Sequence, residues 1–304
     1  MAAGTTGPAG SDADNLRGVA LALVAVVAFV IMSLILKHLA HQLPLAVIAF
    51  FRLLFSLLVL GPWALSAGTV RIAPWRLAEH AVMTVVGVGS LVTFVYSLDK
   101  LILADAMALA FSNPLWSILL SVLILREPVR LRRWTATAIG FLGVLMIVRP
   151  AGQVQPAMIM ALLSAVFTSL SVIMVKRLSA IEPAVQLAAL YSLMATLLTF
   201  GPAIATWQTP DPVQLAWLAA AGLAGLVGQV FQVRAVAVAD VTLVAPLDFL
   251  RPPLGALVAL VLWSEVPDGW TVAGTAVIAL ASAYIARREA VVRKAPRAGR
   301  RRRR

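Results

Sequence analysis

The two halves of this chain repeat each other. A constant shift along the sequence takes one group of residues onto identical residues in the second half, and a second group recurs with offsets that differ by a few residues, which loops can absorb. Because each half is almost wholly apolar, the repeated unit is predicted to be a group of membrane helices. The first group is Lys37, Leu39, Pro44, Ala49, Leu54 and Leu58, which recur as Lys176, Leu178, Pro183, Ala188, Leu193 and Leu197; the second is Ala104, Asp105, Pro114, Glu127 and Trp134, which recur as Ala239, Asp240, Pro252, Glu265 and Trp270.

The composition excludes an ordinary soluble domain. Of the 304 residues, 61% are hydrophobic and 12% are charged, whereas soluble domains have about half and about a quarter. The chain has no cysteine, which rules out disulfides and thiolate chemistry. Its three histidines, His38, His41 and His80, are predicted at helix ends and do not form a metal-binding motif. We therefore expect neither a metal nor a bound cofactor.

The apolar blocks predict an all-α integral membrane protein with ten transmembrane helices, arranged as two inverted five-helix repeats. Each block is about 20 residues long, enough to cross a hydrocarbon core of about 30 Å. Residues 18–149 form the first predicted repeat and residues 150–286 the second, joined at Arg149-Pro150-Ala151-Gly152. The predicted spans are 18–36, 44–65, 77–97, 101–124, 134–149, 156–175, 184–206, 213–236, 241–263 and 269–286.

The basic residues predict the orientation. With ten spans, one side of the membrane carries 20 Lys/Arg and the other carries Lys37, Lys100 and Arg149, so both termini are predicted to be cytoplasmic in an inner (plasma) membrane. Residues 1–17 are expected to be disordered. Ten of the 25 Lys/Arg lie in the tail 287–304, which has no aromatic residues and is expected to contact anionic lipid rather than nucleic acid.

An odd number of helices per half makes the two halves inverted, and inverted repeats support alternating access in secondary carriers. The chain has no phosphate-binding GxxxxGK[ST] motif, so we expect no ATP hydrolysis. A membrane-embedded enzyme would need a paired acid and base, or a metal cluster, which these residues do not supply. A passive facilitator is the remaining alternative; unlike a carrier, it would show neither saturation nor counterflow.

Three ionisable residues are predicted near the middle of the membrane: Arg52, Asp248 and Arg251. A charge there costs at least about 2.5–3.5 kcal/mol, so it is kept where it is partnered or functional. Asp248 and Arg251 lie three residues apart on one helical face and are expected to pair. The three charges sum to +1, which suits an anionic substrate group; the alternative is a structural network joining the halves. Asp248 is also the one carboxylate deep enough for proton coupling.

Other residues mark a site at the same depth. Pro114, Pro252 and Pro253 predict helix breaks that line a cavity or serve in gating. Asp105 and Asp240 are interpreted as helix N-terminal residues, Glu127 and Glu265 as solvated, and glycines such as Gly143 and Gly225 as packing residues. The further candidates for substrate contact, each of which has packing as its alternative, are Phe111, Asn113, Trp116, Tyr191 (the repeat equivalent of Arg52), Gln229 and Gln232.

The segments 104–114, 125–130 and 140–150 resemble an EamA-type member of the drug/metabolite transporter superfamily, with the likeness running from residue 18 to about 286. The resemblance implies a secondary carrier with a central cavity between the halves, mostly an exporter of amino acids, related anions or drugs. Import of a vitamin or cofactor-like molecule, of the riboflavin or S-adenosylmethionine type, is the alternative. Asp105 and Pro114 are nine residues apart but Asp240 and Pro252 twelve, so the ninth helix departs from the fourth. The coupling ion and a homodimeric state are left open.

Overall fold

The computed structural model describes residues 12–66, 76–125, 131–149, 154–178, 182–239 and 244–294, and every regular element within them is a helix. The predicted all-α class is confirmed for this part of the chain. The first half contains α1 (Asp12–Ala40), α2 (Leu45–Ser66), α3 (Leu77–Lys100), α4 (Leu103–Ala110), α5 (Asn113–Leu125) and α6 (Leu131–Val148). The second contains α7 (Pro156–Leu178), α8 (Ala184–Ala205), α9 (Pro212–Val238), the 3₁₀ helix η2 (Ala245–Leu250), α11 (Arg251–Trp263) and α12 (Gly269–Lys294).

Eight helical stretches in the described residues are long and apolar enough to cross a membrane. One of them, Leu103–Leu120, joins α4 to α5, and another, Pro246–Trp263, joins η2 to α11. Two further apolar helices, Trp134–Val148 and Gly269–Ile285, are shorter. The chain is therefore a multi-pass membrane protein.

The first and last helices are longer than the sequence predicts. α1 begins at Asp12 rather than residue 18, and Asp14 places negative charge in its first turn, at the positive end of the helix. α12 continues to Lys294, so the first part of the predicted tail is helical. Residues 1–11 and 295–304, with Glu127, Asp240 and residues 150–152, lie outside the described residues.

Two helices are interrupted just ahead of the predicted prolines. Between α4 and α5, the chain turns at Phe111 and Ser112, so that Pro114 falls at the start of α5. Between η2 and α11, the helix changes from 3₁₀ to α at Arg251, with Pro252 at its start. A proline in the first helical turn removes an N–H that has no partner inside the helix. The prolines therefore begin a new helical segment instead of kinking a continuous one.

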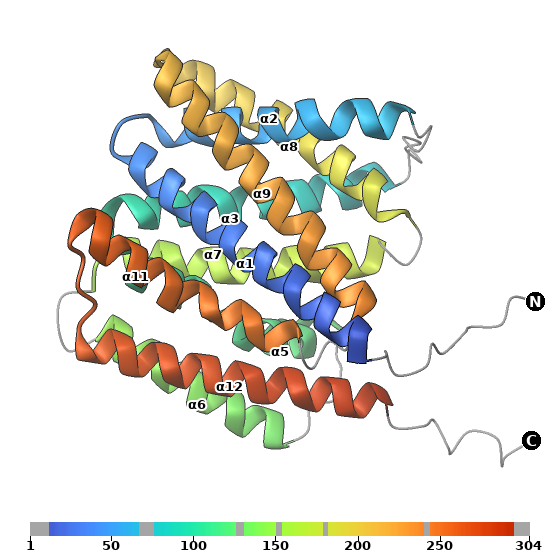
Figure 1. The fold of residues 1–304 in the computed structure, drawn as a ribbon, viewed down its shortest axis with the longest axis vertical. Coiled ribbons are helices and arrows are strands. Elements are labelled where there is room, and N and C mark those ends of the chain that lie inside the picture. The colour runs from blue at the N-terminus through green and yellow to red at the C-terminus, as the bar shows by residue number, and fades with distance from the viewer. Residues whose placement is uncertain are drawn as a thin grey trace, which may run out of the picture.

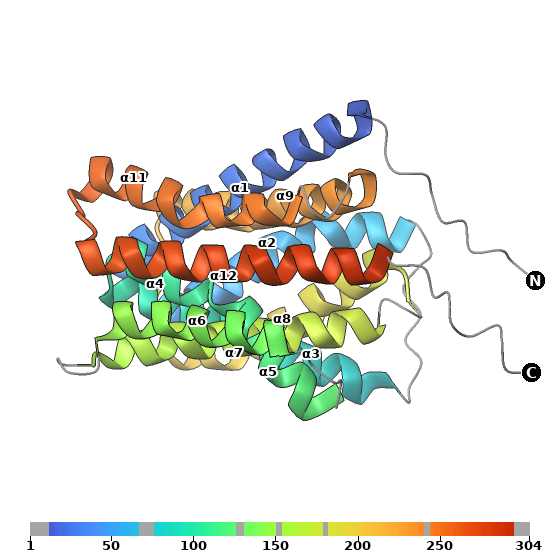
Figure 2. The same ribbon diagram turned by 90° about the horizontal axis from the view of Figure 1, so that it is seen from below.

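The helices pack mainly across the two halves of the chain. α1 lies against α9, α3 against α7, α2 against α8, and α6 against α12. Figure 1 shows α1 and α9 crossing one face side by side, with α6 and α12 paired at one edge. The main hydrophobic core accordingly draws residues from both halves, among them Leu36, Leu98, Met107 and Leu218. The start of α1 and the end of α12 lie at the same end of the bundle (Figure 2).

Candidate functional site

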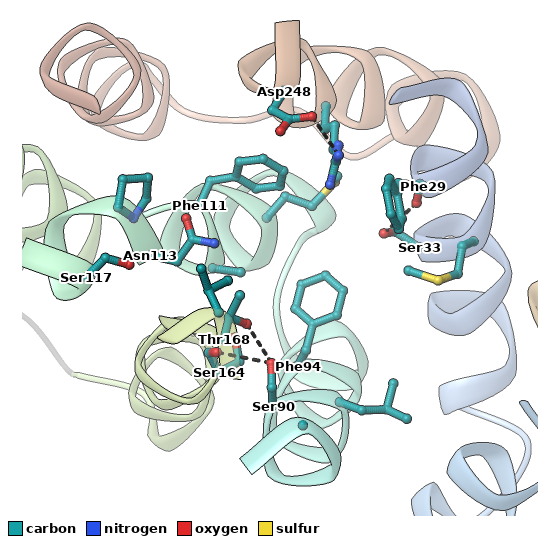
Figure 3. A pocket seen from close by; sticks show the side chains of 18 of the residues that line it. Phe29, Ser33, Ser90, Phe94, Phe111, Asn113, Ser117, Ser164, Thr168 and Asp248 are labelled. Atoms are coloured by element: carbon teal, nitrogen blue, oxygen red, sulfur yellow. Dashed lines mark hydrogen bonds and ion pairs between the residues drawn. The ribbon is translucent and has the colours of Figure 1, made fainter. Parts of the chain in front are cut away.

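A cavity of about 560 Å³ lies between the two halves of the chain. Residues from α1 to α5 line it from one half, and residues from α7, α8, η2, α11 and α12 line it from the other. Figure 3 shows Phe29, Phe94 and Phe111 around the same space as Asn113 and Asp248. The lining thus combines aromatic faces with hydroxyl, amide and charged groups: Phe29, Phe94, Phe111 and Phe249 with Ser33, Arg52, Ser90, Asn113, Ser117, Ser164, Thr168, Tyr191, Asp248, Arg251 and Ser282.

Asp248 and Arg251 form an ion pair at the cavity wall, where the change from η2 to α11 sets both side chains on one face. Nη2 of Arg251 lies 2.6 Å from Oδ1 of Asp248, and the Gln232 amide donates to Oδ2 of Asp248 at 3.0 Å. The Arg251 guanidinium also lies 4.0 Å from the ring centre of Phe29 and 5.5 Å from that of Phe111. The predicted pairing is therefore present, and it makes this corner of the cavity electrically neutral.

Arg52, unlike Arg251, has no acidic partner among the described residues. Among the residues that the structure describes, none offers Arg52 a carboxylate within 4 Å, and its guanidinium donates only to the Met32 thioether, at 3.1 Å. Tyr191 lies close enough to Arg52 to interact with it electrostatically. The three predicted intramembrane charges thus line one cavity as a neutral pair and a separate cation.

Hydroxyl groups line the wall between α3 and α7. The Ser90 hydroxyl lies 2.7 Å from that of Thr168 and donates a hydrogen bond to the Ser164 carbonyl oxygen at 3.1 Å. These residues and Phe29 are not predicted from the sequence. Serine, threonine and phenylalanine are common in membrane helices for packing, so nothing in a single sequence separates cavity-lining ones from the others.

The structure brings most, but not all, of the predicted substrate-contact residues to the cavity. Trp116 instead packs edge-on against Phe141 and donates to the Ser112 hydroxyl. Gln229 is exposed, because the opposite face of α9 packs against α1 and α2, and Gln232 reaches the cavity only through Asp248 and Arg251. Pro252 is buried in packing and Pro253 is exposed. Those that line the cavity are Arg52, Phe111, Asn113, Pro114, Tyr191, Asp248 and Arg251.

The prediction that Glu265 is solvated is wrong. Its carboxylate lies 2.7 Å from Nζ of Lys37, accepts the Leu103 backbone N–H at 2.7 Å, and its side chain is 17% exposed. Lys37 is buried and also donates to the Leu101 carbonyl oxygen at 2.6 Å. A buried lysine needs a partner, and the loop after α11 supplies it. This ion pair ties α1, the α3–α4 junction and the α11–α12 loop together, one helical turn along α1 from the cavity residue Ser33.

A second ion pair lies at the same end of the bundle. Arg149, in a left-handed conformation with φ of 48°, donates to Asp268 ahead of α12. Asp268 also accepts the Thr271 backbone N–H at 2.8 Å. These bonds hold the pKa of Asp268 below its ordinary value, with Arg149 the main cause. The loop beside the Lys37–Glu265 pair is thereby fixed to the end of α6.

Comparison with known proteins gives consistent matches along most of the chain. The profile of the EamA-like transporter family matches residues 16–149 and again residues 155–287. The chain is 32% identical to a riboflavin transporter of Rhizobium johnstonii, with 88% of this chain and 90% of that protein covered. It is 31% identical to a pseudopaline exporter of Pseudomonas aeruginosa (89% and 96% covered). It is also 26% identical to an S-adenosylmethionine uptake transporter of Rickettsia prowazekii (89% and 92% covered). One crystal structure has the same fold, with a TM-score of 0.61 at 21% identity over 90% of this chain and 99% of that one.

Proposed function

The chain belongs to the EamA-like transporter family, and on that premise we propose that it is a secondary carrier that exports a small polar or amphipathic metabolite, such as an amino acid or a related anion. The observation that carries this proposal is the cavity between the two halves, which holds Arg52, Asp248 and Arg251 inside otherwise apolar helices. Ionisable groups at that depth mark a substrate pathway in a membrane protein. The relatives' names indicate a transporter and not an enzyme.

Alternating access between inverted five-helix repeats is the proposed mechanism. The helix pairing supports it, because exchanging the two halves turns the contact of α1 with α9 into that of α7 with α3. The contacts of α2 with α8 and of α6 with α12 map onto themselves. The family profile also matches once in each half. In this arrangement the Lys37–Glu265 pair closes one end of the pathway, and must open for the cavity to reach that side.

Uptake of a vitamin or cofactor-like molecule is the second candidate. It is favoured by the S-adenosylmethionine uptake transporter among the relatives. The riboflavin transporter among them and the aromatic part of the lining favour a flat substrate, since Phe29, Phe94, Phe111 and Phe249 offer faces on which a ring system can stack. The relatives include both an exporter and an uptake transporter, so the family alone does not fix the direction.

Untargeted metabolite profiling of the medium tests the proposal. Cells overproducing the native chain are compared with cells producing Ser117→Trp, whose larger side chain would occupy the cavity. We expect at least one polar metabolite to accumulate outside with the native chain only, at equal membrane yield of both. Depletion of a compound from the medium by the native chain would instead establish uptake and replace the export proposal.

A further inference from the structure

Arg52 is the one cation of the cavity lining without a carboxylate partner in the described part of the chain. Arg251 is neutralised by Asp248 at 2.6 Å and held by Gln232 at 3.4 Å. Arg52 has only the Met32 sulfur, which is a weak acceptor. Nε is buried without a hydrogen-bond partner in both arginines, but Arg251 has the Asp248 carboxylate and Arg52 has no carboxylate among the described residues. The uncompensated positive charge of the cavity is therefore located at Arg52, on α2, and not at the Asp248–Arg251 pair.

We propose that Arg52 binds a single oxyanion group of the transported molecule, a carboxylate or a phosphate, while Arg251 is a wall residue whose charge is already satisfied. The proposal rests on the proposed transport function and locates the binding point within it. A buried charge that lacks a partner is strongly destabilising, and a bound anion supplies the missing partner. A guanidinium is suited to this role because its planar fork donates two parallel hydrogen bonds to a carboxylate or phosphate.

The helices next to Arg52 and Tyr191 pack closely against these two side chains. A Cβ atom on Gly225 of α9 would lie 3.0 Å from Nη2 of Arg52, and one on Gly87 of α3 would lie 2.8 Å from the Tyr191 hydroxyl oxygen. Glycine at both positions therefore lets Arg52 and Tyr191 lie against neighbouring helix backbones. Two polar groups positioned by packing in this way form a preorganised site.

The rest of the lining indicates what the anionic group is attached to. Beside the Asp248–Arg251 pair, the cavity offers the aromatic rings of Phe29 and Phe111, which lie against the Arg251 guanidinium. On the wall between α3 and α7 it offers the hydroxyl groups of Ser90 and Thr168. Those groups suit a ligand whose remaining part is apolar on one side and forms hydrogen bonds on the other. The ligand class is accordingly a small amphipathic molecule with one anionic group.

Binding to purified protein in nanodiscs tests this without requiring any transport. The probes are benzoate, phenyl phosphate and benzamide, which share a ring and differ in charge, titrated by their effect on the melting temperature. We expect benzoate or phenyl phosphate to bind the native chain roughly tenfold more tightly than benzamide, the factor expected for a charge-assisted hydrogen bond. Whichever anion binds more tightly identifies the oxyanion.

The preference for benzoate or phenyl phosphate over benzamide is expected to disappear in Arg52→Gln and to survive in Arg52→Lys. It is also expected to remain in the control Arg234→Gln, which removes an exposed arginine of α9. If Arg52→Gln does not fold, the double variant Asp248→Asn/Arg251→Gln decides instead. It leaves Arg52 as the cation of the described cavity lining, so it is expected to keep the anion preference, and loss of the preference there would overturn the proposal. Equal effects of the three probes on the native chain, or an anion preference retained in Arg52→Gln, would overturn the proposal. Absence of exported metabolites together with this anion preference would overturn the export proposal alone.

Discussion

At the scale of single residues, the charged side chains of the cavity differ in whether they have a partner of opposite charge. Asp248 and Arg251 neutralise each other, and Gln232 bonds to both of them from α9. An isolated charge in the membrane is costly, whereas a hydrogen-bonded pair adds little net charge. The pair therefore links α9 to the start of α11. The net positive charge that would attract an anionic ligand is then the charge of Arg52.

A double-mutant cycle on the pair measures this coupling. Asp248→Asn and Arg251→Gln each leave one partly buried charge without its partner. The cost of this is about 3–5 kcal/mol of stability in a fully buried pair and is expected to be smaller here. The double variant removes both charges, so its loss is expected to be smaller than the sum of the two single losses. Unfolding of the three variants in one detergent gives the values, with Arg234→Gln as the exposed control. Strictly additive losses would show that the two side chains do not interact.

At the scale of helices, the sequence predicts most of the spans and the positions of both interruptions. Apolar length fixes a span, and a proline cannot occupy a helix interior without losing a hydrogen bond, so Pro114 and Pro252 point to the breaks. It does not predict which face of a helix meets the cavity. Every face of α9 is apolar or small, so Gln229, exposed on the outside, and Gln232, beside Asp248, are equivalent in the sequence.

Two glycines of the described helices are expected to respond oppositely to the same substitution. In α12, a Cβ atom on Gly274 would lie 2.6 Å from the Gly143 carbonyl oxygen of α6, so Gly274→Ala must push the two helices apart. Overpacking of this kind costs about 1–3 kcal/mol. In α8, nothing lies within 4 Å of the corresponding position on Gly201, so Gly201→Ala should leave the melting temperature unchanged or raise it. Equal losses in both would contradict the close packing of α6 and α12.

At the scale of the whole molecule, the two ends of the bundle are joined by different contacts. At the end where α1 finishes, Lys37 and Glu265 form the ion pair that we propose closes the pathway on that side of the cavity. At the opposite end, Glu182 accepts from Arg76 at 3.4 Å and lies 3.1 Å from His80, connecting α3 to the loop before α8. Glu265 was expected to be solvated because a residue beyond the end of a helix usually is, and its partner Lys37 is more than 200 positions away in sequence. Such pairs depend on how the halves dock, which one sequence does not reveal.

Thiol labelling of intact cells tests both the closure and the orientation, and the absence of native cysteine makes single cysteines specific reporters. Ser33→Cys places a thiol on the cavity wall one turn from Lys37, and Gln208→Cys places one in the exposed loop that contacts Gln42 at the same end. With a membrane-impermeant reagent outside the cells, Gln208→Cys is expected to react rapidly and Ser33→Cys slowly. Adding Glu265→Gln removes the carboxylate that holds Lys37, so Ser33→Cys should then react several times faster, with Gln208→Cys unchanged. An unreactive Gln208→Cys would reverse the predicted orientation, and an unchanged rate at Ser33→Cys would show that the ion pair does not close the pathway.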